Sequence, residues 1–219
     1  MPEALRIGIV GAESTGKTTL AQALAVRLAA DTGGRVAWVP ELLREWCQRF
    51  GRTPLAHEQA PLLRAQHERI EQAAATHDIV VCDTTALMTA VYSRMIFGDR
   101  SLDDRAVELH RRMALTLLTA LDLPWVADGL QRDGPQVREP VDRALRELMG
   151  AHRLPFAVVG GSGAQRLHNA AAATAALLRP GTPHRGGLFT RLDAGRGAAR
   201  GWACECCNPE AEQALLRRP

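Results

Sequence analysis

The chain has 219 residues, of which 46% are hydrophobic and 23% charged, and its formal net charge is +3. This length suffices for one α/β domain with a sizeable core and a short appendage. No apolar run approaches the ~20 residues needed to span a bilayer, so a membrane protein is excluded. The small net charge gives no broad basic face for nucleic acid. The N-terminus leads straight into a predicted strand without a signal peptide, so we expect a cytoplasmic protein.

Strand and helix patterns alternate along the chain. Residues 7–10 form the first predicted strand, and a helix follows with Leu20, Leu24 and Leu28 on one face. The other predicted strands are residues 35–39, 78–82, 115–118 and 156–159. The other predicted helices are residues 42–50, 56–76, 86–97, 102–113, 140–152 and 163–178. This alternation predicts a parallel five-stranded sheet flanked by helices, with right-handed crossovers.

A phosphate-binding loop links the first strand to the first helix. Residues 11–18, GAESTGKT, match G-x-x-x-x-G-K-[ST] without a break, which predicts a P-loop NTPase. The glycines let backbone N–H groups form a nest for phosphate oxygens. Lys17 would reach the β- and γ-phosphates of ATP, and the Thr18 hydroxyl would hold Mg²⁺. The residues expected to bind ATP are Gly11, Glu13, Ser14, Thr15, Gly16, Lys17, Thr18 and Thr19.

Lys17 is the only lysine among the 27 Lys and Arg residues of the chain. A general drift toward arginine would have placed Arg at this position too. A compact ammonium on a flexible stem fits a phosphate cradle, whereas a planar guanidinium does not. The lone lysine therefore favours a working P-loop over a chance match in a Gly-rich loop.

Two carboxylates stand where the second and third predicted strands end, the edge at which open parallel sheets bind ligands. Glu41 could act as the general base that accepts the proton of an attacking hydroxyl, with Arg44 one turn further on. Its alternative role is a cap of the following helix. Asp83 could hold Mg²⁺ through water or bind a substrate hydroxyl, or it could be a structural strand-end residue. We expect the strand that precedes Glu41 to lie beside the P-loop strand.

A long polar loop, residues 122–139, follows the fourth predicted strand. Loops of this length often act as lids, and Arg132 or Arg138 could stabilise phosphoryl charge there, or both could be solvated. Trp125 could stack on a flat ring, or it could anchor the loop to the core. Asp128 lies in the same loop.

Four segments carry a resemblance to a known family: GAESTGKTTL, VPELLREW, IVVCDTTALMTAVYSRMIFGD and PWVADGLQRDG. Together they resemble the ribosylnicotinamide kinase domain of NadR-type proteins, over residues 6 to about 178. The last segment is the most specific, because the P-loop is shared by a vast superfamily.

The resemblance implies a P-loop kinase that uses ATP and Mg²⁺ to convert nicotinamide riboside to its mononucleotide, a step of NAD biosynthesis. It implies phosphate and Mg²⁺ roles for Lys17 and Thr18, and a lid position for Arg132. Around the substrate it places Glu41, Arg44, Asp83, Trp125 and Asp128. As catalytic residues we expect Lys17, Glu41, Asp83 and Arg132, with Thr18 and Asp83 at the metal.

Two other functions remain open at this stage. One is an ATP- or GTP-driven regulatory module that binds a protein partner, and the other is a deoxynucleoside kinase. The strand-end carboxylates and the Trp-bearing loop favour a pocket for a second small molecule over a switch, which needs a residue that orients water. Neither the nucleotide preference nor the oligomeric state follows from the sequence.

The composition changes at Pro180, so we expect a kinase domain over residues 1–179 and an appendage over residues 180–219. The appendage begins as a Gly- and Arg-rich linker and ends in a short tail with Cys204, Cys206 and Cys207. Zinc binding there with His184 is disfavoured, because structural zinc sites prefer C-x₂-C pairs. An unstructured or redox-sensitive tail is the expected alternative.

Overall fold

Five parallel strands form the sheet on which the candidate site is built, in the order β2-β3-β1-β4-β5. The computed structural model describes residues 3–126 and 134–178. Its strands are β1 (Leu5–Val10), β2 (Val36–Val39), β3 (Ile79–Asp83), β4 (Leu115–Thr119) and β5 (Ala157–Val159). The predicted α/β class and P-loop NTPase fold are confirmed.

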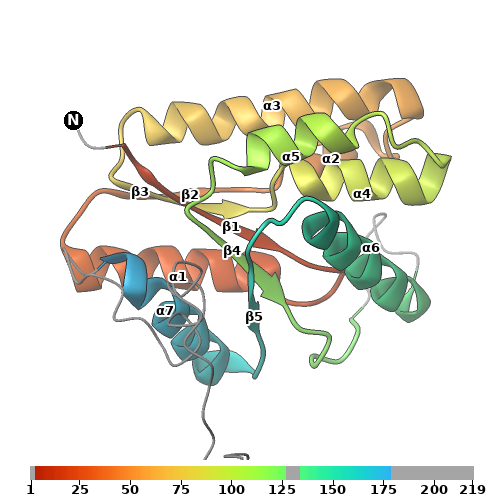
Figure 1. The fold of residues 1–219 in the computed structure, drawn as a ribbon. Coiled ribbons are helices and arrows are strands. Elements are labelled where there is room, and N and C mark those ends of the chain that lie inside the picture. Colours follow the sequence, from red (N-terminus) through yellow and green to blue (C-terminus); the bar gives the residue numbers. More distant parts are fainter. Residues whose placement is uncertain (1–2, 127–133, 179–219) are drawn as a thin grey trace, which may run out of the picture. The chain divides into compact units, whose positions relative to one another are not determined.

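Helices cover both faces of the sheet (Figure 1). They are α1 (Lys17–Thr32), α2 (Leu42–Phe50), α3 (Ala56–Ala74), α4 (Ala86–Phe97), α5 (Asp103–His110), α6 (Arg138–Ala151) and α7 (Gly163–Leu178). A 3₁₀ turn, η2 (Pro135–Val137), leads into α6. Helices α1 and α7 lie on one face, and α3, α4, α5 and α6 lie on the other.

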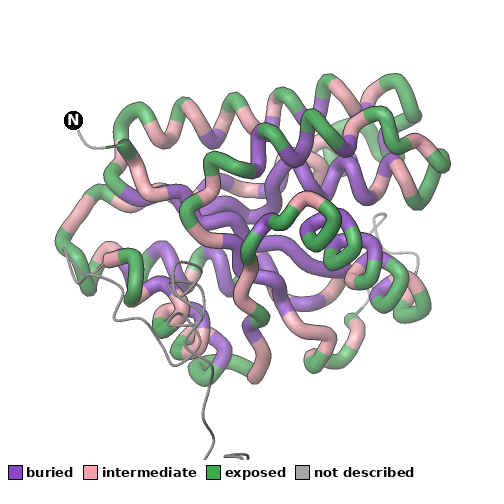
Figure 2. Tube along the Cα trace, viewed as in Figure 1, coloured by how far each residue is buried: buried purple, intermediate pink, exposed green. Residues whose placement is uncertain are grey.

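The alternation of side chains along β1 divides the core between the two faces. Ile7 and Ile9 pack with α1 and α7, whereas Val10 packs with α4 and α6. All three are fully buried, and Figure 2 shows the strands as the most buried part of the described chain. The P-loop therefore starts from a buried strand at the centre of the sheet.

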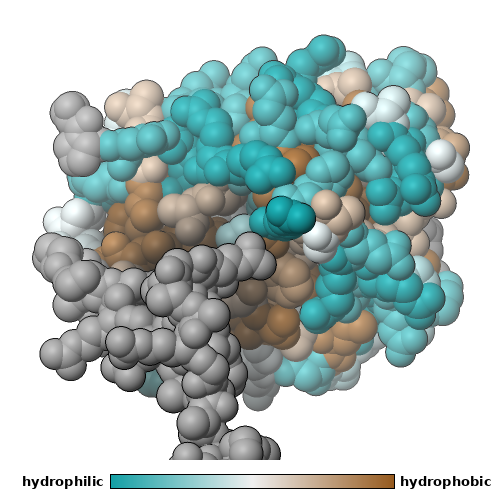
Figure 3. Space-filling model, in the orientation of Figure 1, coloured by the Kyte–Doolittle hydropathy of each residue, from teal (hydrophilic) through white to brown (hydrophobic). Residues whose placement is uncertain are grey.

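The helices carry polar outer faces, as their sequence patterns predict. On the face drawn in Figure 3, the surface over α3 and α5 is largely hydrophilic. Three helices, α1, α2 and α4, end at a glycine with a positive φ, namely Gly33, Gly51 and Gly98. Glycine adopts this left-handed conformation without a steric penalty, which fixes where each helix stops.

The predicted elements agree with the observed ones to within a few residues, and two expectations were wrong. Strand β2 pairs with β3 and not with the P-loop strand. The crossover through α1 places β2 at the edge of the sheet, and the chain then returns through α2 and α3 so that β3 lies between β2 and β1. Arg138 was expected in the polar loop, but it is the first residue of α6 and is only 8% exposed. The turn η2 runs directly into α6, so this helix begins two residues before Pro140.

No helix in residues 3–126 and 134–178 is long and apolar enough to cross a membrane. The boundary expected near residue 179, the linker and the cysteine tail with its zinc alternative lie outside the described residues. Within the described residues, Cys47 and Cys82 are buried free thiols, and no cluster of three His, Cys, Asp or Glu could hold a metal ion.

Candidate active site

The P-loop lies between β1 and α1 and packs closely against Thr119 of β4. Gly11 has φ +152° and Gly16 has φ +75°, and a Cβ on Gly11 would lie 2.0 Å from the Thr119 hydroxyl oxygen. No residue with a side chain could therefore occupy position 11. Gly16 caps the N-terminus of α1, so the positive end of this helix faces the loop. The loop thus has the shape and the polarity of a phosphate cradle.

Lys17 is the first residue of α1 and is only 8% exposed. Its Nζ donates a hydrogen bond of 2.8 Å to the Ala12 carbonyl within the loop. Burial lowers the pKa of Lys17, and the carboxylates of Glu41 and Asp83 oppose that shift. The ammonium therefore lies in a desolvated site in which a phosphate would be a strong additional partner.

Asp83 ends β3, directly beside Ile9 of β1, and is 1% exposed. Burial raises the pKa of Asp83, while the hydrogen bond from the Thr18 hydroxyl lowers it. Its Oδ1 has no hydrogen-bond partner within the described part of the chain. A hydroxyl and a carboxylate with a spare oxygen fit the oxygen ligands that Mg²⁺ prefers. Thr18 and Asp83 would therefore hold the ion, as the sequence predicts.

Glu41 is the N-cap residue of α2, yet its side chain makes no capping hydrogen bond. Its Oε2 lies 3.6 Å from the Arg44 Nε, and the residue is 7% exposed. Burial raises the pKa of Glu41, and the positive charges of Lys17 and Arg44 oppose the shift. The Glu41 side chain therefore does not act as a hydrogen-bonding cap of α2. It belongs to the group of charged side chains around Lys17.

One cavity of about 420 Å³ joins the P-loop to this cluster. Residues 13–19 of the loop form part of its wall, together with Glu41 and Arg44. The remaining wall is mostly apolar and comes from α2 and the loop after it, from α3 and α4, and from η2 and the start of α6. It comprises Leu43, Cys47, Thr53, Pro54, Gln59, Tyr92, Met95, Ile96, Val137 and Val141. The volume and the mixed wall suit a small molecule beside a bound phosphate chain.

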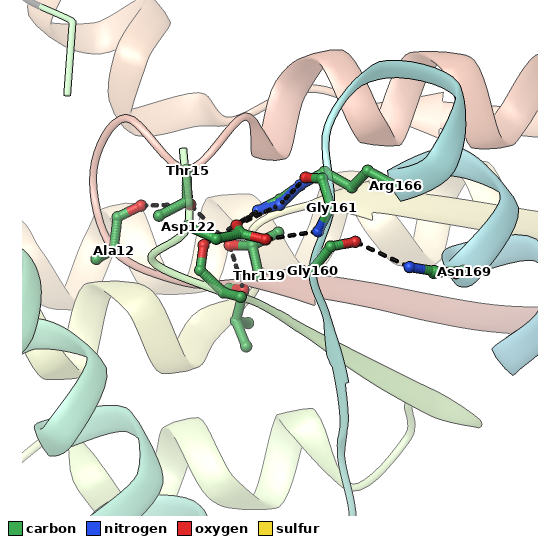
Figure 4. Close-up of polar contacts among 10 residues, drawn as sticks. Ala12, Thr15, Thr119, Asp122, Gly160, Gly161, Arg166 and Asn169 are labelled. Carbon is green, nitrogen blue, oxygen red and sulfur yellow. Dashed lines mark hydrogen bonds and ion pairs between the residues drawn. The ribbon is translucent and has the colours of Figure 1, made fainter. Parts of the chain in front are cut away.

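A second polar network supports the P-loop from β4 and β5 (Figure 4). The Thr15 and Thr119 hydroxyls hydrogen-bond at 2.7 Å. Beyond β4, Asp122 accepts hydrogen bonds from the Gly161 N–H at 2.5 Å and from Arg166 at 3.0 Å. Arg166 also donates to the Ala120 carbonyl at 3.0 Å. This network joins the carboxyl ends of β4 and β5.

The loop after β4 also touches the P-loop directly. The Val126 N–H donates to the Ser14 hydroxyl at 2.8 Å, and Ser14 has a positive φ of 54°. Trp125 is half-buried and does not line the cavity, so both its stacking role and its anchoring role stay predictions. The predicted positions of Asp128 and Arg132 lie outside the described residues.

Several wall residues escaped the sequence interpretation. Gln59, Tyr92 and Met95 lie on helices, where spacing predicts a buried face but does not distinguish core from cavity. Asp122 and Arg166 are 44 residues apart, and no local pattern connects them. For Gln59 alone the sequence held a signal, because a glutamine on the inward face of a helix requires a partner.

Comparisons with known proteins agree with this geometry. Residues 6–166 match the family model described as an AAA domain. A sequence comparison with curated proteins finds no match. Among solved structures, the NadR protein in complex with NR aligns with a TM-score of 0.63 at 20% identity. It covers 78% of this chain, which spans 50% of the NadR chain.

Two further structures extend the comparison. The NadR protein in complex with NAD and AMP-PNP aligns with a TM-score of 0.60 at 21% identity, over 78% of this chain and 48% of that one. Thymidylate kinase from Ehrlichia chaffeensis aligns with a TM-score of 0.56 at 19% identity, over 81% of this chain and 100% of its own. The chain thus spans about half the length of the NadR proteins. The resemblance to their kinase domain is confirmed at the level of the fold.

Proposed function

We propose that the chain, which belongs to the AAA domain family matched over residues 6–166, uses its P-loop as an ATP-dependent kinase for a small nucleoside. The proposed reaction transfers the γ-phosphoryl group of ATP to the primary hydroxyl of nicotinamide riboside. The products are nicotinamide mononucleotide and ADP.

One observation carries this proposal. Glu41, which makes no capping bond, lines the same cavity as the P-loop and is held beside Arg44 in a buried cluster with Lys17. A protein that only hydrolyses ATP needs a positioned water, whereas a kinase needs a cavity for a second substrate and a carboxylate to receive its proton. The cavity and the carboxylate occur together here.

The roles of the residues follow from their positions. The N–H groups of the P-loop and Lys17 hold the phosphates and stabilise the charge of the transferring group. Mg²⁺, when bound by Thr18 and Asp83, would neutralise charge on the phosphate oxygens. Glu41 accepts the hydroxyl proton as the oxygen attacks, and burial makes it a stronger base by raising its pKa. Arg44 keeps the carboxylate oriented.

Three considerations support nicotinamide riboside as the acceptor. The sequence segments resemble a ribosylnicotinamide kinase domain, and one structural neighbour was solved in complex with NR. The apolar wall from α2 and α4 suits a flat ring. Trp125, Asp128 and Arg132 are proposed to complete the site from the loop after β4, with Trp125 stacking on the ring and Arg132 in the lid.

A panel assay tests the proposal. The purified chain is incubated with ATP and Mg²⁺ and with nicotinamide riboside, thymidine, deoxycytidine, thymidylate or no acceptor, and phosphorylated products are identified by mass. We expect nicotinamide mononucleotide to form with the highest kcat/KM, and Lys17→Ala to abolish its formation. A preference for a deoxynucleoside would favour the deoxynucleoside kinase alternative. ATP consumption that no acceptor stimulates would favour the regulatory module.

A further inference from the structure

Among the residues that the structure describes, a buried side-chain oxygen in the cavity wall has no hydrogen-bond partner. Gln59, the fourth residue of α3, is 2% exposed and lines the cavity beside Pro54. Its Nε2 donates a long hydrogen bond of 3.5 Å to the Pro54 carbonyl. Its Oε1 has no hydrogen-bond partner among residues 3–126 and 134–178. One N–H of this amide is therefore used, and its acceptor oxygen is open.

A second glutamine on the same helix shows what a purely structural role looks like. Gln66 is 3% exposed, and both of its polar groups are paired. Its Oε1 accepts from the Leu42 N–H at 2.8 Å, and its Nε2 donates to the Pro40 carbonyl at 3.3 Å. Gln66 does not line the cavity. Gln59 and Gln66 are thus both buried glutamines of α3. Only Gln59 lines the cavity, and only Gln59 has an acceptor oxygen without a partner in the described residues.

We propose that Gln59 reads the base of the nucleoside by accepting a hydrogen bond from an N–H group, and so selects a carboxamide over a carboxylate. This inference rests on the proposed function. A buried acceptor without a partner destabilises the free protein, and an N–H donor on the ligand would remove that penalty. The terminal amide torsion of glutamine is broad, so a small rotation can turn the oxygen toward the ligand.

The carboxamide of nicotinamide riboside carries such an N–H donor. Nicotinic acid riboside has the same ring and sugar, but its carboxylate offers only acceptors. Two acceptors facing each other in a desolvated wall repel, and neither is satisfied. Cys47 and Met95, which line the same cavity, are apolar and offer a carboxylate no charge or hydrogen bond of comparable strength. Sites built around one buried hydrogen bond reject analogues that lack its partner more strongly than apolar pockets do.

The test compares kcat/KM for the two ribosides in the wild type and in matched variants. We expect the wild type to prefer nicotinamide riboside by at least about tenfold, and Gln59→Leu to bring the ratio close to one. The change should come from a loss with nicotinamide riboside, mainly in KM. Because Gln59→Leu removes an unpaired buried oxygen, the variant should fold, and Gln59→Met provides a second, unbranched replacement.

Gln66→Leu is the control. It breaks two hydrogen bonds near Glu41, so it should lower the melting temperature and slow both ribosides equally, with the ratio unchanged. If nicotinamide riboside is phosphorylated but the Gln59 variants keep the wild-type ratio, the inference is overturned while the proposed function stands. If the wild type phosphorylates neither riboside, the proposed function fails and the carboxamide reading fails with it.

Discussion

At the scale of single residues, Glu41 is the side chain on which the proposed chemistry depends. It caps α2 by position and not by hydrogen bonding, which is unusual for a buried carboxylate at a helix start. Since its oxygens do not satisfy the helix N–H groups, their partners are the charged groups of the cavity. Because Glu41 makes no capping hydrogen bond, a mutation of Glu41 should change catalysis without removing a helix cap.

Glu41→Gln keeps the size of the side chain and removes its basicity. We expect kcat to fall by roughly 10²–10⁴, the usual contribution of a general base. The affinity for ATP should be nearly unchanged, because Gln does not disturb the P-loop. Steady-state kinetics at saturating ATP and riboside give the first quantity, and titration with an ATP analogue gives the second.

Asp83→Asn provides the contrast for that experiment. Because Asp83 pairs with Thr18 at the proposed metal position, the variant should shift the Mg²⁺ concentration needed for half-maximal activity. A near-normal kcat in Glu41→Gln together with a complete loss of activity in Asp83→Asn would indicate that Asp83, and not Glu41, is the general base.

His110 gives a prediction about pH and stability. The ring is 2% exposed and lies between the hydroxyls of Thr85, at 3.0 Å, and Thr116, at 2.7 Å. Burial lowers the pKa of His110 to about 4. Between about pH 6.5 and pH 4 the unfolded chain therefore binds a proton that the folded protein excludes. The free energy of unfolding should fall by about 3 kcal/mol as the pH drops through that window.

Urea unfolding at pH 7 and at pH 4 measures this effect in the wild type and in His110→Gln. The variant should be less stable at pH 7 and should lose the contribution of His110 to the pH dependence. His168→Gln, on an exposed position of α7, is the matched control and should keep the wild-type slope. Equal slopes in all three proteins would show that the pKa of His110 is not lowered in the folded protein.

At the scale of the elements, the Asp122–Arg166 pair joins the loop after β4 to α7. The Arg166 side chain is 4% exposed and also donates to two carbonyls, those of Ala120 and Gly161. Asp122 is 39% exposed, so solvent screens its charge and reduces the contribution of the ion pair to the free energy of unfolding. The pair acts mainly by fixing the ends of β4 and β5 near the P-loop.

Arg166→Met should lower the free energy of unfolding by about 1–3 kcal/mol, because it removes the donor to the Ala120 and Gly161 carbonyls and the ion pair with Asp122. Arg27→Met is the matched control: Arg27 pairs with Asp31 on the exposed face of α1, and its loss should cost less than about 1 kcal/mol. Chemical denaturation measures the free energy of unfolding of both variants, and their m-values should equal that of the wild type. Equal costs for the two variants would contradict the supporting role of Arg166.

The positions of the helices and strands could be predicted from the sequence, but the order of the strands in the sheet could not. Hydrophobic periodicity located the strands and α-helices of residues 3–126 and 134–178, since it depends on neighbours within a few residues. It could not tell that β2 pairs with β3, because strand order depends on where each crossover returns to the sheet. It also could not connect Asp122 with Arg166, whose contact exists only in the folded chain. Glu41 and Asp83 were predictable because parallel strands present their carboxyl ends at one edge.

At the scale of the whole molecule, residues 3–126 and 134–178 contain the complete sheet and its three buried clusters. We therefore expect a chain truncated after residue 179 to keep its melting temperature within a few degrees and its kinase activity within a factor of about two. Thermal unfolding and the riboside assay test this. A large drop in stability, or stoichiometric zinc in the full-length protein that disappears on truncation, would show that the last 40 residues are part of the structure.

The place of β1 in the sheet has a consequence for the order in which the protein can form. Both strands that pair with β1 lie far ahead of it in the chain, at residues 79–83 and 115–119. During synthesis the first strand and the P-loop therefore leave the ribosome without a paired strand. The first partner, β3, is complete only when residue 83 has emerged, and the second, β4, only when residue 119 has emerged. A nascent chain arrested before that point holds the complete nucleotide motif but lacks the sheet that shapes it, so ATP binding should begin late in translation.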